Sequence, residues 1–257
     1  MRPTIAELRS VAQPPSVVGR VSGEHWAGKL YQRHLSIYVT RLLVPTRVKP
    51  DTVTWLMFPL GLGAAVVLTV PHVWAAVVAV LLIQLQGLFD CVDGELARWR
   101  KQFAPSGVFL DRLGHYVTDA GLVAAVGVRA DGGFDHIAGW TSIGLAAAAL
   151  ALLTKAQTDL VLVARFQSGK ERLPDETATS APRAGVLRRL RRFMAVMPIN
   201  RALLAMEMTL LATAAAVADG VNGGHAGTQA LSAALLATAG FVVIARLPSI
   251  LTSARLR

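Results

Sequence analysis

The chain has 257 residues, of which 53% are hydrophobic, and a formal net charge of +10. This much apolar residue, gathered in long runs, excludes an ordinary soluble globule and indicates a polytopic membrane protein. The positive charges cluster in particular loops, which favours contact with a membrane surface over a nucleic-acid partner. The one cysteine, Cys91, excludes an intrachain disulfide, and we interpret it as a packing residue.

The first 49 residues divide into two parts. Residues 1–24 are polar and contain three prolines, which predicts a mobile N-terminal tail. Residues 25–49 predict a juxtamembrane amphipathic helix and a linker, because large apolar residues recur among cations at near-helical steps: Trp26, Leu30, Tyr31, Leu35, Tyr38 and Leu42. We expect this helix to lie in the membrane interface, and the alternative is a short helix packed on the loops.

Residues 50–257 predict an all-α domain of six transmembrane helices. The six apolar segments cover about residues 53–70, 73–99, 107–128, 137–166, 198–221 and 228–252. Each is long enough to cross roughly 30 Å of hydrocarbon. The third segment is the least apolar, because it carries several polar residues, and we count it as a span because it must pair with the second.

Charged residues predict the orientation of the domain. Residues 1–50 and residues 165–192 each contain eight Lys or Arg, the latter including the Arg188–Arg192 run. The connections that would face the other side, at 70–72, 129–136 and 222–227, contain only Arg129. Cytoplasmic loops carry an excess of Lys and Arg, so both termini are expected on the cytoplasmic side of the cell (inner) membrane.

Two sets of residues stand at helical spacing on the second and third segments. The first set shares one helix face: Asp90, Asp93, Gly94 and Ala97. The second set shares one face of the next helix: Gly107, Asp111, His115 and Asp119. If the two faces meet, several acidic or imidazole groups converge in apolar surroundings, where they need a cation. Oxygen-rich sites of this kind suit Mg²⁺ or Mn²⁺.

These residues resemble the signature of the CDP-alcohol phosphotransferase family, D-x-x-D-G-x-x-A-R, about eight residues, then G-x-x-x-D-x-x-x-D. Seven of the eight fixed positions match in register: Asp90, Asp93, Gly94, Ala97, Arg98, Gly107 and Asp111. The eighth departs from the pattern, because the family's fourth aspartate is His115 here.

The resemblance implies an activity and a set of partners. A CDP-linked alcohol, most often CDP-diacylglycerol, binds at the cytoplasmic membrane face, the hydroxyl of an alcohol or polyol phosphate attacks the β-phosphorus, and CMP leaves. In a minority of such enzymes the lipid is the acceptor. The resemblance also implies a homodimer and two Mg²⁺ or Mn²⁺ ions.

Site residues follow from the same resemblance, position by position. The expected metal ligands are Asp90, Asp93, Asp111 and His115. The CDP moiety and its diphosphate are expected at Asp90, Gly94, Ala97, Arg98 and Gly107. The expected catalytic residues are Asp111, His115 and Asp119.

His115 leaves three hypotheses open. It can act as the base that deprotonates the attacking hydroxyl, with Asp119 one turn away fixing its tautomer. It can be a metal ligand that shifts the preference toward Mn²⁺ or Zn²⁺. The chain can also be an impaired or repurposed relative that binds nucleotide or metal without catalysis.

Two further readings place the ionisable residues outside catalysis. The carboxylates can pair with Arg98 and Arg112 and simply join helices. A small transporter is the other class, but it would carry polar residues through the full depth of several spans.

Overall fold

The computed structural model describes residues 2–18, 26–170, 199–252 and residue 256. All regular secondary structure in these residues is helical, which confirms the predicted all-α class. The Arg188–Arg192 run and Pro198, the first residue of the fifth predicted span, lie outside the described residues.

Long helices form most of the described chain. They are α5 (Met57–Leu68), α6 (Val73–Arg100), α7 (Pro105–Ala130), α8 (Gly139–Gln167), α10 (Ala205–Asn222) and α11 (Ala226–Thr252), with the short α4 (Pro50–Trp55) before α5. The N-terminal part contributes α1 (Ile5–Ala12), α2 (Pro15–Val18), η1 (Gly28–Gln32) and α3 (Arg33–Leu43). Two 3₁₀ turns, η2 (Phe134–His136) and η3 (Ile199–Leu203), precede α8 and α10.

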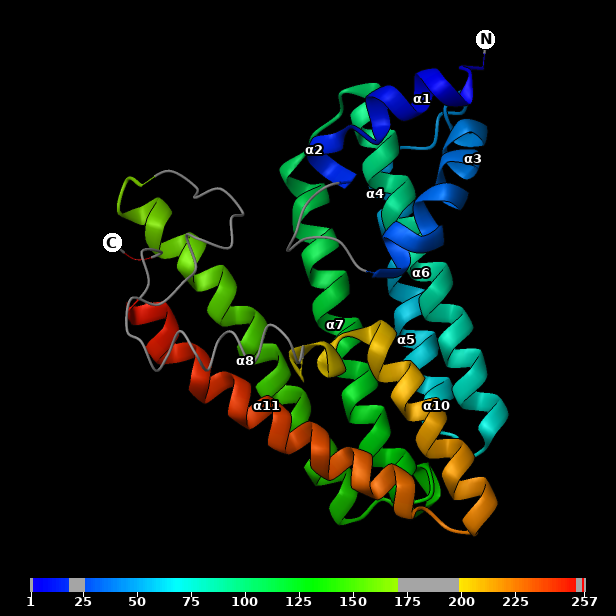
Figure 1. The fold of residues 1–257 in the computed structure, drawn as a ribbon, viewed down its shortest axis with the longest axis vertical. Helices are drawn as coiled ribbons and strands as arrows, with labels where there is room; N and C mark the ends of the chain where they lie inside the picture. Colours follow the sequence, from blue (N-terminus) through cyan, green and yellow to red (C-terminus); the bar gives the residue numbers. More distant parts are fainter. Residues whose placement is uncertain (1, 19–25, 171–198, 253–255, 257) are drawn as a thin grey trace.

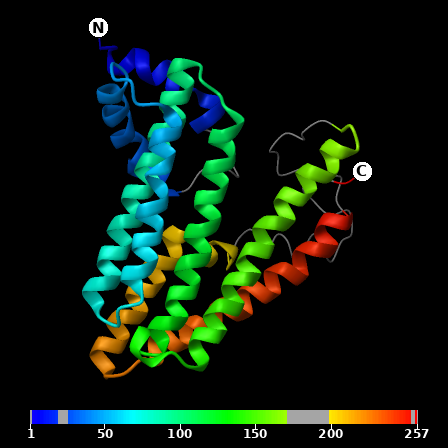
Figure 2. The ribbon, with the colours of Figure 1, turned by 180° about the vertical axis from the view of Figure 1, so that it is seen from behind.

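Helices α5, α6, α7 and α10 lie side by side as a bundle, and α1 and α3 cover one of its ends (Figures 1 and 2). Helices α8 and α11 pack along each other and diverge from the bundle toward that same end. The core is rich in small residues, including Ala64, Ala76, Ala79 and Ala212, which are fully buried. Small side chains let the helices approach closely where lipid gives no hydrophobic driving force.

Four helical stretches in the described residues are long and apolar enough to cross a membrane. They are Pro50–Leu68, Val73–Arg100, Gly139–Gln167 and Ala226–Thr252. Helices α7 and α10 are not among these four, because the polar motif residues of α7 and the two acids of α10 lower the mean hydropathy of these helices. The expectation of six spans therefore remains a prediction.

The first predicted span is two consecutive helices, with a break at Leu56 between α4 and α5. Pro59 has no backbone N–H to donate to the carbonyl of Trp55, so the regular ladder is interrupted there. The fifth predicted span, about 198–221, also differs, because the described residues form η3 first and α10 begins only at Ala205.

The expectation of a mobile polar tail over residues 1–24 does not hold for residues 5–12, which form α1. Thr4 and Glu7 make a capping box at its start, and Leu8 and Ala12 are fully buried against Ile37 of α3. Only Leu8 and Ala12 are buried in α1, so its apolar pattern is too short to predict the helix. What holds the helix in place is its contact with α3 and α6.

The predicted juxtamembrane helix corresponds to η1 and α3, which follow each other without a gap. Its outer face exposes Leu30, Leu35, Tyr38 and Leu42. Its inner face buries Ser36, Ile37 and Thr40. This two-sided pattern agrees with an interfacial position, which stays a prediction.

The backbones of α7 and α8 are in close contact near the connection between the two helices. A Cβ added to Gly127 would lie 2.7 Å from the Cα of Gly144, so only glycine fits at this crossing. Asp131 then begins α8 by accepting hydrogen bonds from the backbone N–H groups of Ala138 and Thr141. Burial tends to raise the pKa of Asp131, but the hydrogen bonds from Thr141 and its neighbours outweigh it and the pKa is lowered.

Candidate functional site

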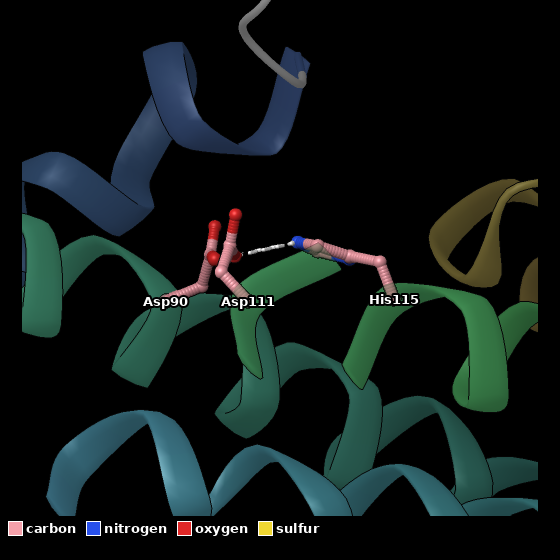
Figure 3. Close-up of side chains that lie close together, drawn as sticks. All are labelled: Asp90, Asp111 and His115. Carbon is pink, nitrogen blue, oxygen red and sulfur yellow. Dashed lines mark ion pairs between the residues drawn. The ribbon is translucent and has the colours of Figure 1, made fainter. Parts of the chain in front are cut away.

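Two carboxylates and one imidazole meet where α6 and α7 face each other. The Nε2 atom of His115 lies 3.3 Å from Oδ1 of Asp90 and 3.5 Å from Oδ1 of Asp111. Figure 3 shows the two carboxylates side by side with the imidazole facing them. Asp111 and His115 are one turn apart on α7, and Asp90 comes from the facing turn of α6. The two helix faces predicted from spacing therefore meet at these three residues.

This cluster fits a divalent cation. One ligand atom from each of Asp90, Asp111 and His115 lies within 4.8 Å of the other two. Two negative charges at that separation repel by about 3–4 kcal/mol at an effective dielectric of 20. A bound cation removes this repulsion, and two carboxylates with one imidazole form a donor set for divalent metals.

Water can reach the cluster. The side chains of Asp90, Asp111 and His115 are 35%, 44% and 44% exposed, respectively. A substrate phosphate could approach these atoms, because they are not sealed inside the bundle.

Asp93 has a different partner from the other motif acids. Its Oδ2 accepts a hydrogen bond of 2.6 Å from the hydroxyl of Thr54 in α4, and the residue is 9% exposed. It is therefore not part of the three-residue cluster, although its charge still interacts with those of Asp90 and Asp111.

The sequence predicts a contact between Asp119 and His115, but in the structure Asp119 has other partners. Its Oδ2 lies 2.6 Å from Nζ of Lys155 on α8, and its Oδ1 accepts a hydrogen bond of 2.8 Å from the backbone N–H of Ala205. Ala205 is the first residue of α10, so Asp119 caps that helix from another part of the chain. Both carboxylate oxygens are thus occupied in joining α7 to α8 and α10.

The remaining motif residues lie beside the cluster on the same two helices. Nε of Arg98 donates to the carbonyl of Ala12 at 2.5 Å, while a Cβ on Gly94 would lie 3.1 Å from Nη1 of Arg98. A Cβ on Gly107 would lie 3.1 Å from Oδ1 of Asp51, so this glycine allows α7 to begin close to α4. Ala97 is partly buried on α6.

Comparison with known proteins agrees with the geometry of the motif. The family model of CDP-alcohol phosphatidyltransferase matches residues 47–253, which is most of the chain. The chain belongs to this family. No curated protein matches the chain.

CDP-alcohol phosphatidyltransferases are transferases that move a phosphatidyl group from a CDP-alcohol in lipid synthesis, and they generally depend on divalent metal. The matched residues include α4 to α8, α10 and all of α11, and they begin after α1 and α3. The N-terminal helices α1, α2, η1 and α3 therefore lie outside the matched region.

Sequence reasoning missed Glu95, which lies within the family motif and is fully buried. Its Oε1 accepts hydrogen bonds from Gln13 and Ser36, and its Oε2 accepts one of 2.6 Å from Thr40. Glu95 thereby fastens the N-terminal helices to α6 of the phosphatidyltransferase region. The one signal in the sequence was an acidic residue between Gly94 and Leu96. Its role could not be predicted, because its partners are 55–82 residues away in the chain.

Ion pairs between helices do occur in the described residues, but they use other partners than expected. Arg112 pairs with Asp159 of α8, and the hydroxyl of Tyr116 donates to the same carboxylate at 2.7 Å. In the described residues, the motif carboxylates Asp90 and Asp111 face His115 and form no ion pair with Arg98 or Arg112. The reading of Asp90 and Asp111 as groups that pair with Arg98 and Arg112 to join helices is therefore not supported.

Proposed function

We propose that the chain transfers a phosphatidyl group from a CDP-alcohol, CDP-diacylglycerol first among the candidates, to the hydroxyl of a small alcohol or polyol phosphate. The observation that carries this proposal is the convergence of Asp90, Asp111 and His115 at positions of the family motif. In the reaction, the acceptor oxygen forms a bond to the β-phosphorus. The bond from that phosphorus to the bridging oxygen breaks, and CMP leaves with that oxygen.

Asp90, Asp111 and His115 would hold a divalent cation in this reaction. When bound there, the cation would neutralise charge on the diphosphate, which is the main task in phosphoryl transfer. His115 is proposed as the third ligand, because its Nε2 faces both carboxylates. The acceptor proton passes to water, which reaches these partly exposed side chains.

Other motif residues supply binding and position. The terminal nitrogens of Arg98 lie over Gly94, where they could contact the diphosphate of the donor. Ala97 and Gly107 would leave room for the cytidine, as the family pattern implies. Asp119 is assigned a positioning role, because it fixes the start of α10.

We also propose that the transfer of the phosphatidyl group takes place at the cytoplasmic face of the cell membrane, and that the protein crosses this membrane six times. Arg98, Arg100 and Lys101 lie at the motif end of α6, and the N-terminal helices cover the same end of the bundle. Cations gathered at one end agree with a cytoplasmic orientation.

Release of CMP from CDP-diacylglycerol by the full chain in detergent tests the proposal, with candidate acceptors added singly and with Mg²⁺, Mn²⁺ or a chelator. We expect metal-dependent release that Asp90→Asn and Asp111→Asn each lower by at least about a hundredfold. Asp135→Asn, a change of an exposed acid in η2, is the matched control and should leave the rate unchanged.

Two results would contradict the proposal. Binding of CDP-alcohol without CMP release would favour a non-catalytic relative that holds nucleotide or metal. A chain that binds no cytidine compound at all would favour the transporter reading.

A further inference from the structure

A pocket of about 480 Å³ lies between the N-terminal segment α1–α2 and the start of the juxtamembrane helix. Four of its lining residues are basic or titratable: Arg9 from α1, Lys29 from η1, and Arg33 and His34 from α3. Among the described residues that line the pocket, none carries a carboxylate. The pocket therefore has three fixed positive charges with histidine neutral.

The composition of the pocket favours a phosphate monoester over a general anionic surface. Arginine presents a planar set of N–H donors that binds phosphate with two parallel hydrogen bonds, and lysine adds a point charge. Pro15 and Val18 form an apolar part of the wall, which suits the carbon skeleton that bears the phosphate. A pocket of this size can enclose a small organic phosphate. A flat basic surface, in contrast, attracts anionic lipid headgroups without enclosing any one of them.

The walls of the pocket are fixed by contacts with α3 and α6. The side-chain amide of Gln13 donates at 2.7 Å both to the carbonyl of Arg33 and to Oε1 of Glu95. The apolar contact of Leu8 and Ala12 with Ile37 holds α1 against α3. Because both sides are anchored, the cations are held near one another before any ligand arrives, which lowers the entropic cost of binding.

One lining residue of the pocket, Arg33, interacts electrostatically with the acidic cluster. The positive charge of Arg33 acts on Asp90 and on Arg98, so the guanidinium lies close to the motif. A molecule whose phosphate rests on Arg33 would have its remaining atoms close to the carboxylates of α6 and α7.

We propose that this pocket binds a phosphate monoester. On the proposed function, this group is the phosphate of the acceptor, held while its hydroxyl faces the acidic cluster. The phosphate belongs either to a water-soluble organic phosphate or to a lipid headgroup, since the pocket lies beside the exposed apolar face of η1 and α3. The assignment to the acceptor rests on the proposed function, whereas phosphate binding itself does not.

Binding is measured directly on the full chain in phosphatidylcholine nanodiscs. Inorganic phosphate and glycerol phosphate are the soluble probes, phosphatidic acid added to the nanodisc is the lipid probe, and phosphatidylglycerol is a charged lipid without a monoester. Arg9 and Lys29 are exposed, so Arg9→Gln/Lys29→Gln removes two charges without disturbing the core. We expect it to weaken binding by at least about tenfold, as expected for lost charge-assisted hydrogen bonds.

The control is Arg47→Gln, which removes a cation from an exposed position that does not line the pocket, and it should bind as the wild type does. Binding of a soluble probe supports a soluble source, and binding of phosphatidic acid alone supports a lipid source. Three results overturn the proposal: no binding of any probe, unchanged binding by the double variant, or equal binding of phosphatidylglycerol and phosphatidic acid.

Two separate readouts distinguish this proposal from the proposed function. If CMP is never released but phosphate binding still depends on Arg9 and Lys29, the pocket stands and the proposed function fails. If CMP release depends on Asp90 and Asp111 but phosphate binding is unchanged by the double variant, only the pocket fails.

Discussion

At the scale of single residues, His115 presents one nitrogen to the carboxylates of Asp90 and Asp111, where the family's aspartate would present two oxygens. Mg²⁺ strongly prefers oxygen ligands, while Mn²⁺ and Zn²⁺ accept imidazole readily. One nitrogen cannot bind a cation and accept a proton at the same time. The roles of ligand and base are therefore exclusive for Nε2.

The first prediction follows from this exclusion. Activity of the wild type should be higher with Mn²⁺ than with Mg²⁺, and His115→Asp should shift the preference toward Mg²⁺. His115→Ala should weaken metal binding by at least about tenfold, with partial recovery of turnover at high Mn²⁺. Metal titrations of CMP release check each variant. Lost turnover with unchanged metal affinity in His115→Ala would instead identify a base.

Much of the cluster could be predicted because the spacing of Asp111 and His115 fixes their shared helix face before any packing is known. The partner of Asp119 could not be predicted in this way. Lys155 and Ala205 are 36 and 86 residues further along the chain, and their contact with Asp119 depends on how α8 and α10 pack on α7. Spacing within one helix says nothing about such partners.

At the scale of helices, Asp119 joins three of them. It lies on α7, pairs with Lys155 of α8 and caps α10, and its side chain is 3% exposed. A buried charge that loses its partner is costly, while the loss of a half-exposed ion pair costs little.

The second prediction compares the two kinds of ion pair between α7 and α8. Asp119→Asn should lower the free energy of unfolding by about 3–5 kcal/mol, because the ammonium of Lys155 is left without its partner. Asp159→Asn, at the more exposed pair with Arg112, should cost about 0–1 kcal/mol. Denaturation of the full chain in detergent, followed by circular dichroism, measures both.

Asp119→Asn combined with Lys155→Met should recover part of the lost stability, since no charge is then left unpaired. An Asp119→Asn variant with normal stability and slow turnover would restore the Asp119–His115 pair proposed from the sequence.

Most helix boundaries could be predicted, because runs of apolar residues end at polar or glycine-rich connections, as at Val73–Arg100 and Gly139–Gln167. Helix α1 could not be predicted from its composition. Only Leu8 and Ala12 are buried in it, and its anchor is Glu95, 82 residues from Gln13. A helix of 8 residues is marginal alone and depends on tertiary contacts of this kind.

At the scale of the whole molecule, the bundle has two distinct ends. The N-terminal helices and the turn after Arg100 lie at one end, while the 131–138 connection and the turn after Asn222 lie at the other (Figure 1). If α5, α6, α7, α8, α10 and α11 all cross the bilayer, these two groups of connections face opposite sides of the membrane.

The third prediction tests this arrangement with single cysteines at exposed positions. Gln102→Cys should react with a membrane-impermeant maleimide only from the cytoplasmic side, and Asp135→Cys and Asn222→Cys only from the opposite side. The native Cys91 is buried and serves as an internal background control. Labelling of Gln102→Cys and Asp135→Cys from the same side would mean that α7 does not cross the membrane.

Because Glu95 anchors α1 to α6, α1 can complete its contacts only after α6 has been synthesised. The ribosome makes residues 5–12 first, but their binding partners on α6 emerge more than eighty residues later. Helix α1 can pack on α3 earlier, but it must wait for its anchor on α6 while the first two hydrophobic segments enter the bilayer. A nascent chain that is halted before Glu95 leaves the exit tunnel should keep its N-terminus open to proteases.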